Sequence, residues 1–391
     1  QVLRAAWESG ADESDPLVAL LVSREGPVWF PQEDTTFYLD RTPGDAFRGL
    51  VGELDAIAVR HPKAAARAMV VADNSVLTEP VIFQRGDPVL RGNPVPRQFL
   101  TALTPDRQPF ADGAGRLDLA NAIASDRNPL TARVWVNRVW MHHFGEGLVR
   151  STSNFGFTGE RPSHPELLDW LAGELLRSGG SLKHIHRLIL TSKAWQQSVQ
   201  HPDESRYSDI DADNRWLWRG NRRRQDAESL RDAILAASGE LDLKTGGPGF
   251  VPTLSSDALE GLSRKDAAWT ASPADEQRRR SLYMYLQRSL QPPMMTTFDQ
   301  CDTTISCGRR DVSIVAPQAL TLMNNQFLHD RAQALAKTTI STSDPATRVN
   351  HVWKAILHRE PSADELAESL SHLRKQQQQL THSLQQLTQQ H

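Results

Sequence analysis

The stretch NPLTARVWVNRVWMHHFGEGLV, residues 128–149, contains the clearest helix signal in the chain. The side chain of Asn128 can cap a helix, and Pro129 fits the first turn, where its missing N–H costs nothing. Gly145 is a typical helix stop because it adopts the left-handed conformation without strain. The stretch therefore predicts a helix that begins after Asn128 and ends at Phe144.

Similar signals recur on both sides of this helix. Further helices are expected after Ser163, Ser181 and Asp226, and Glu166 completes a capping box with Ser163. Pro317 is expected to open a helix that continues through Ala334. Short strands are expected within residues 68–83 and 281–287, and a long surface loop at 240–275. The predicted fold is mainly α, with helical hairpins or a bundle, a few short strands and long loops.

The predicted organisation has three parts: a helical lead-in at residues 1–64, the main helical domain at 65–365, and a terminal helix at 366–391. The terminal helix carries leucines at alternating spacings of four and three, with Gln377 in the one polar slot: Leu366, Leu370, Leu373, Leu380, Leu384 and Leu387. This heptad pattern favours a coiled-coil or docking helix.

Composition excludes several classes of function. With 44 basic and 47 acidic residues, the net charge of −3 offers no general attraction to nucleic acid. No apolar run is long enough to span a membrane, and no signal peptide is visible. Because the chain begins at Gln1 without Met, we expect it to be part of a longer protein.

The sequence also lacks the common signatures of cofactor and metal sites. Two cysteines, Cys301 and Cys307, lack zinc-ligand spacing, and the haem-attachment motif C-x-x-C-H does not occur. Walker, dinucleotide-binding, zinc-protease and nucleophile-elbow motifs do not occur either. We therefore expect neither a metal nor a cofactor on this chain.

Three stretches together resemble a domain of unknown function found at the C-terminus of planctomycete proteins, over residues 65–365. The motifs that carry the resemblance are the opening stretch at 128–149, SNFG (153–156), PSHPELLDW (162–170), NRWLWR (214–219), RRRQDAESLRD (222–232), FD (298–299), CGRR (307–310), APQAL (316–320) and Asn324. In those proteins the domain lies downstream of cytochrome-c-like domains. The resemblance implies an extracytoplasmic protein with a c-type haem on a companion domain, and it implies no reaction.

The chain departs from the family pattern at two places. Cys301 stands where the family usually has Pro, and the Gln-rich helix beyond Leu366 has no counterpart. In an extracytoplasmic protein we expect Cys301 and Cys307 to form a disulfide that closes a short loop.

The proposed site combines two irregular segments where the resemblance is densest, the Asn154–His164 turn and the Asp299–Arg310 loop. We expect the two segments to converge on one polar cleft. The helix N-terminus beside His164 and the guanidinium groups of Arg309 and Arg310 would favour an anionic group there. The alternative is that the two arginines only tie their loop to nearby carboxylates, Asp299, Asp302 or Asp311.

Other histidines and arginines favour structural roles. His142 and His143 are adjacent on a helix, so they point about 100° apart and cannot chelate one metal together. His184 and His186 likewise lie on different faces. The run at 222–224, three arginines, could meet phosphate or sulfate, but a solvated or salt-bridged face is the commoner arrangement.

Three classes of function fit these observations. The first is a non-catalytic module that packs against, or positions, a haem-bearing partner domain. The second is an enzyme acting on an anionic polysaccharide, sulfated or carboxylated, with Asp299 and Glu166 in acid–base roles. The third is a cell-surface assembly unit that uses the terminal helix. The missing catalytic signatures favour the first.

Overall fold

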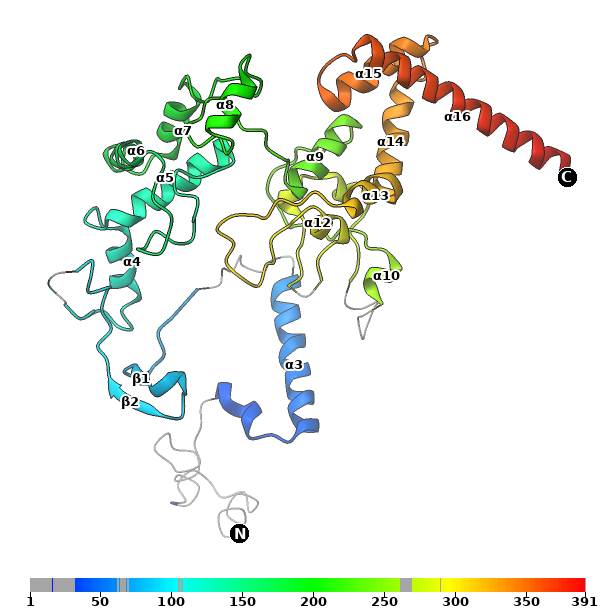
Figure 1. Cartoon of the computed structure of the whole chain (residues 1–391). Coiled ribbons are helices and arrows are strands. Elements are labelled where there is room, and N and C mark those ends of the chain that lie inside the picture. Colours follow the sequence, from blue (N-terminus) through cyan, green and yellow to red (C-terminus); the bar gives the residue numbers. More distant parts are fainter. Residues whose placement is uncertain are drawn as a thin grey trace. The chain divides into compact units, whose positions relative to one another are not determined.

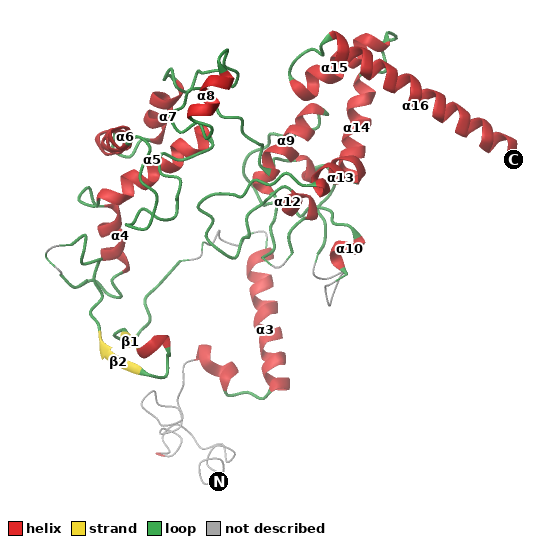
Figure 2. Cartoon of the chain, viewed as in Figure 1, coloured by secondary structure: helices red, strands yellow, loops and turns green. Residues whose placement is uncertain are grey.

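The computed structural model describes residues 16, 32–61, 63, 68, 70–104, 106, 108–260, 269–288 and 290–390 (Figure 1). The chain forms two compact units, Gln1–Val95 and Pro96–His391. Most regular structure in both units is helical, as Figure 2 shows, so the mainly α prediction is confirmed. No helix among the described residues combines the length and apolar character that a membrane span requires.

The described residues of the first unit include one long helix and one small sheet. Its elements are η1 (Gln32–Phe37), α3 (Arg41–Arg60), β1 (Val81–Phe83), η2 (Gln84–Gly86) and β2 (Arg91–Pro94). β1 and β2 pair antiparallel, with Val81 opposite Pro94. The strand expected at residues 68–71 does not form at 68, 70 and 71, and Met69 lies outside the described residues. Much of the predicted 1–64 lead-in also lies outside them.

The second unit begins with a group of helices, three of which form one apolar core. They are α4 (Arg116–Ala124), α5 (Pro129–Phe144), α6 (Pro165–Arg177), α7 (Leu182–Leu190) and α8 (Glu204–Ile210). α5, α6 and α7 contact one another and bury mainly branched and aromatic side chains, among them Val136, Trp140, Phe144, Leu171, Ile185 and Ile189. The burial of these side chains holds the three helices together.

Three of the predicted caps form, and one does not. The side chains of Asn128, Ser181 and Asp226 accept hydrogen bonds from backbone N–H groups in the first turns of α5, α7 and α9 (Ala227–Ala237). The capping box at Ser163 is wrong, because α6 begins one residue later, with His164 at the cap position. The hydroxyl of Ser163 instead shares a hydrogen bond with Nδ1 of His164, 2.9 Å away.

The second unit continues with a separate group of helices. After α9 they are α10 (Ser256–Leu259), the 3₁₀ turns η3 (Glu276–Arg278) and η4 (Ser281–Tyr283), α12 (Pro293–Thr297), α13 (Ala316–Asn324), α14 (Gln326–Thr338), α15 (Pro345–Leu357) and α16 (Ala363–Gln390). A second apolar cluster joins α9 to α12 through Ala227, Met294, Met295 and Phe298.

Two expectations in this region are corrected. The strand at 281–287 is the turn η4 followed by isolated bridges at Met284 and Gln287, because the partner segment near Phe250 follows it for one residue only. The helix expected from Pro317 breaks at Asn325, whose backbone is extended and whose side chain caps α14 by accepting from the Phe327 N–H.

Two buried arginines fix the irregular backbone that follows α9. Arg279 is 1% exposed, lies over the ring of Tyr283 and donates to the carbonyl oxygen of Pro248. Arg231 donates in turn to the carbonyl oxygen of Arg279, and burial lowers the pKa of Arg231 to about 10. Guanidinium groups therefore satisfy buried carbonyls that the irregular backbone leaves without partners.

A buried amide joins α5 to the chain that leaves it. Asn137 is 1% exposed; its Nδ2 donates to the Val149 carbonyl, and its Oδ1 accepts from the Val149 N–H. Gly147 lies directly above this pair, where a Cβ would stand 2.8 Å from the Asn137 Nδ2. The amide replaces the ladder bonds that this buried backbone lacks.

Asn137→Ala should therefore lower the free energy of unfolding by about 3 kcal/mol, because two buried backbone groups lose their partners at roughly 1–3 kcal/mol each. Chemical denaturation monitored by circular dichroism would measure the loss. Arg138→Ala on the exposed side of the same helix is the control. Equal stabilities of the two variants would contradict the role assigned to Asn137.

Candidate functional site

The Asp299–Arg310 loop lies against Thr152 and Ser153, which immediately precede the Asn154–His164 turn. A Cβ added to Gly308 would stand 2.1 Å from the Ser153 hydroxyl oxygen and 3.1 Å from that of Thr152. Beside this contact, Nη1 of Arg309 donates to Oε2 of Glu146 at 2.8 Å. The loop that ends at Arg310 therefore lies beside the start of the turn that contains Asn154.

The polar groups of the Asn154 turn are used within the turn. Oδ1 of Asn154 accepts from the Gly156 N–H at 3.0 Å, and Nδ2 donates to the Thr158 hydroxyl at 3.0 Å. The Ser151 hydroxyl donates to the Asn154 carbonyl and accepts from the Glu160 N–H. These bonds fix the turn and leave the ring of Phe157 fully exposed at its tip.

His164 also has internal partners. Besides the bond to Ser163, its ring meets the ring of Trp216 edge to face, with 5.4 Å between centroids. It lies at the N-terminus of α6, as expected.

Asp299 organises the chain that follows the disulfide loop. Its carboxylate accepts from the Ser313 N–H at 2.8 Å and from the Ser313 hydroxyl at 2.7 Å. These hydrogen bonds lower the pKa of Asp299, the one from the Ser313 N–H most. The positive charge of Arg224 lowers it further by a smaller amount. The backbone of Asp299 has a φ of 61°, a left-handed conformation that Asp tolerates better than most residues.

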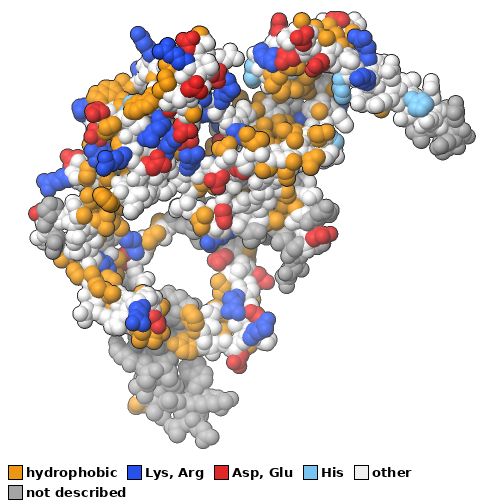
Figure 3. All heavy atoms as spheres, viewed as in Figure 1, with side chains coloured by type: hydrophobic (Ala, Val, Ile, Leu, Met, Phe, Trp, Pro, Cys, Tyr) orange, Lys and Arg blue, Asp and Glu red, His pale blue; other side chains and the backbone are white. Residues whose placement is uncertain are grey.

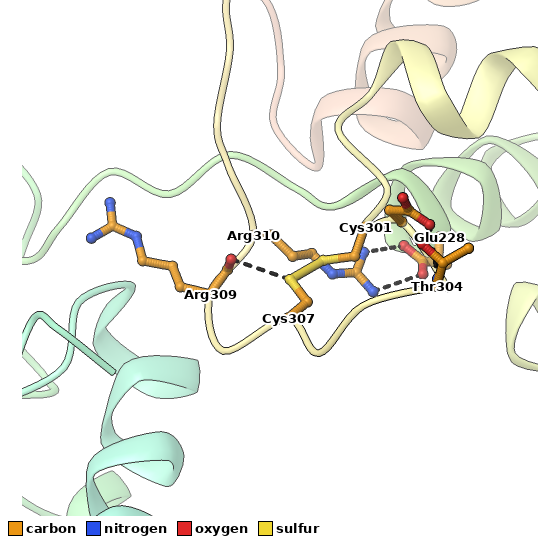
Figure 4. Close-up of a disulfide and its surroundings, with 7 residues drawn as sticks. Glu228, Cys301, Thr304, Cys307, Arg309 and Arg310 are labelled. Carbon is orange, nitrogen blue, oxygen red and sulfur yellow. Dashed lines mark hydrogen bonds and ion pairs between the residues drawn. A yellow bond between two sulfur atoms is a disulfide. The ribbon is translucent and has the colours of Figure 1, made fainter. Parts of the chain in front are cut away.

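The two arginines bind carboxylates on two different helical regions. Arg309 pairs with Glu146, and Arg310 forms two parallel bonds to Glu228 on α9, one of them 2.8 Å between Nη2 and Oε1. Figure 4 shows the two side chains pointing in opposite directions from the loop. The expectation that Asp299, Asp302 or Asp311 pairs with these arginines is therefore wrong. Carboxylates do bind both arginines, as expected, but they are those of Glu146 and Glu228.

Cys301 and Cys307 form the predicted disulfide, which is confirmed (Figure 4). It closes the loop immediately before Gly308. Within the loop Asp302 accepts from the Thr304 N–H, and Ile305 remains 70% exposed.

A buried polar network anchors the segment between this loop and α14. Gln318 is 2% exposed; its Nε2 donates to the Thr297 carbonyl at 3.0 Å, and its Oε1 accepts from Arg224 at 2.7 Å. Arg224 also donates to the Ser313 carbonyl. Arg224 therefore has a structural role beneath this segment. Arg223 donates to the His142 carbonyl, and Arg222 pairs with Glu204.

Four large apolar side chains on this segment and on α13 are exposed. We call them the apolar strip: Val312 (66% exposed), Ile314 (88%), Leu320 (56%) and Met323 (68%). Leu320 and Met323 share a face of α13 because they are three residues apart. Figure 3 shows hydrophobic side chains gathered over α13 and α14. Exposed apolar side chains gathered in this way are typical of an interaction surface.

A small cleft lies beside the Arg309–Glu146 pair. Its lining includes Glu146, Arg150, Glu160, Ser163 and Arg215, and water-sized molecules can occupy about 20 Å³ of it. That volume holds about one water molecule. Glu160 and Ser163 of the predicted Asn154–His164 turn line it, and no residue of the Asp299–Arg310 loop does, so this cleft is not the polar cleft expected between the two segments.

The structure joins two histidines whose pairing has no local signal in the sequence. Nε2 of His143 on α5 and Nδ1 of His186 on α7 are 2.7 Å apart. Burial, then the neighbouring charges of His186 and Arg223, lower the pKa of His143. His184 bonds instead to Glu174. No group of three or more His, Cys, Asp or Glu side chains that could hold a metal occurs within the described part of the chain.

Comparison with known proteins identifies one family. A family model described as "PSD1: Protein of unknown function (DUF1553)" matches residues 115–373, which include both segments of the site. No curated protein and no solved structure matches the chain.

Titration of the unreduced, unfolded protein should find no reactive thiol. Replacing both cysteines by alanine should cost about 2 kcal/mol of stability, since the disulfide restricts a short loop of the unfolded chain. Denaturant unfolding of this double variant measures that cost. Two reactive thiols, or an unchanged midpoint, would contradict this assignment.

Acid should reduce the advantage that the wild type holds over Asp299→Asn. A carboxyl with a lowered pKa stabilises the fold above its unfolded pKa, near 3.8, and this stability is lost as the pH falls through the folded pKa. The difference in unfolding free energy between the two proteins should therefore be largest at neutral pH and shrink below about pH 4. Thermal unfolding across this range measures it, and a difference independent of pH would rule out the assignment.

Proposed function

This chain belongs to the PSD1 family, described as protein of unknown function (DUF1553), and we propose that it is a non-catalytic docking module of a larger extracytoplasmic protein. The partner proposed is a companion domain that bears a c-type haem, as the resemblance to planctomycete C-terminal domains implies. The docking surface is the apolar strip together with Phe157 and Ile305.

One observation carries the proposal: at this site the polar side chains are engaged in hydrogen bonds and ion pairs within the chain, and the apolar side chains beside them are exposed. Asn154, Asp299, Arg309 and Arg310 all hold the loops in place. The exposed apolar side chains beside them lie on segments that are fixed by a disulfide and a buried polar network. Rigid apolar groups bind protein surfaces well, because little conformational entropy is lost on binding.

The same observation disfavours an enzyme acting on an anionic polysaccharide. Such a substrate would have to compete with Glu146 and Glu228 for the two arginines. Asp299 is saturated with hydrogen bonds from Ser313, and Glu166 is an exposed residue in the first turn of α6. The proposed extracytoplasmic location is supported by the disulfide, which persists in oxidising compartments.

Binding of this chain to the haem-bearing domain of the same polypeptide tests the proposal, with calorimetry as the readout. Ile314→Asp should weaken binding roughly tenfold or more, since a charge would be buried at the centre of the strip. Ile210→Asp is the matched control, because Ile210 is 73% exposed at the end of α8. Equal weakening by both variants, or no binding by the wild type, would overturn the proposal.

A further inference from the structure

The first turns of α16 are fixed to α15. Leu366 and Leu370 are partly buried, and the indole N–H of Trp353 donates to the Ser369 hydroxyl at 3.3 Å. Arg359 forms two bonds of 2.7 Å to Glu365, and the pair lowers the pKa of that carboxyl to about 2. The helix therefore leaves α15 in a defined direction.

Beyond these turns, α16 has no cover among the described residues. Every side chain described from Ser371 to Gln386 is exposed, including Leu373 at 45% and Leu380 at 63%. Figure 1 shows this half of the helix extending away from α15. Exposed leucines at a regular helical spacing are typical of a helix face that is buried against a partner.

The stripe follows the heptad positions of a coiled coil. With Leu366 at position d, the next d positions along the sequence are Leu373, Leu380 and Leu387. The a positions between them are Gln377 and Leu384. One polar residue among apolar a and d positions is typical of coiled coils whose register is specified.

The residues at the e and g positions beside the stripe are compatible with pairing to a second copy of the same helix. In a parallel pair each g residue faces the next e residue of its partner, and the facing residues here are Ser369 with Arg374, Gln376 with Thr381, and Ser383 with Thr388. No like charges meet, and no opposite charges are present that would select a different partner. Repulsion between e and g charges, the usual barrier to self-pairing, is therefore missing.

We infer that the second half of α16 forms a parallel, in-register, two-stranded coiled coil with a second copy of this chain. Gln377 determines the arrangement. In register, the two Gln377 amides face each other, and each can donate to and accept from its counterpart. In an antiparallel pair, a positions face d positions, and each Gln377 amide would lie against leucine without a partner.

The proposed dimer is independent of docking to the companion domain. It uses residues beyond Leu373, where the family match ends, and none of the apolar strip. The expected consequence is a protein that presents two docking surfaces. We expect an association that depends on protein concentration.

Sedimentation analysis of the whole chain across a wide concentration range tests the dimer. The wild type should shift from monomer to dimer as concentration rises. Leu380→Lys should remain monomeric, whereas Gln378→Lys, at the outward b position, should dimerise like the wild type. A wild type that is monomeric throughout, or equal behaviour of the two variants, would overturn the inference.

Cross-linking tests the register separately. Under mild oxidation Leu380→Cys should form a disulfide-linked dimer, because the two d positions of a parallel in-register pair lie side by side. Gln378→Cys should cross-link far less. A dimer in which Leu380→Cys fails to cross-link, or does so no faster than Gln378→Cys, would contradict the parallel arrangement.

Discussion

The hydrogen bonds from Ser313 to the carboxylate of Asp299 set the course of the segment between the disulfide loop and α13. They turn Ser313 inward, where Arg224 holds its carbonyl and Gln318 connects the same arginine to α12. With the serine and glutamine inward, the neighbouring Ile314 is left facing solvent. The exposure of the apolar strip is thus a consequence of a polar network beneath it.

Polar side chains also position the loop that the disulfide closes. Arg309 and Arg310 join it to Glu146 and Glu228, residues that belong to the two separate helical groups of the second unit. Because surface ion pairs contribute little stability, their main effect is to position the loop. Arg309 and Arg310, which suggested an anion site, therefore hold the loop on which Ile305 is exposed.

Features with local causes could be predicted from the sequence, whereas those that depend on distant partners could not. The caps at Asn128 and Asp226 formed as expected because a cap requires only the next three residues. The Ser163 cap did not form, and the Ser163 N–H and hydroxyl instead donate to the carbonyl of Leu148, 15 positions earlier. The strand expected near Met284 failed because its register depends on Phe250, a distant residue.

The site shows the same division. The disulfide was predicted from the expected extracytoplasmic location and from one departure from the family pattern, Cys301 in place of Pro. The partners of Arg309 and Arg310 lie 163 and 82 positions away, and the partner of His143 lies 43 positions away, so no local pattern could indicate them. The exposure of Ile314 depends on Asp299 and Gln318 acting together, which only the folded chain reveals.

Carbene footprinting of this chain joined to the proposed companion domain tests the docking claim most directly. Exposed side chains react with the carbene, and contact with a partner protects them. The account predicts protection of Ile314, Met323 and Phe157 relative to the isolated chain, while Ile210 reacts equally in both. Unchanged reactivity of the apolar strip would contradict the account, as would protection confined to other surfaces.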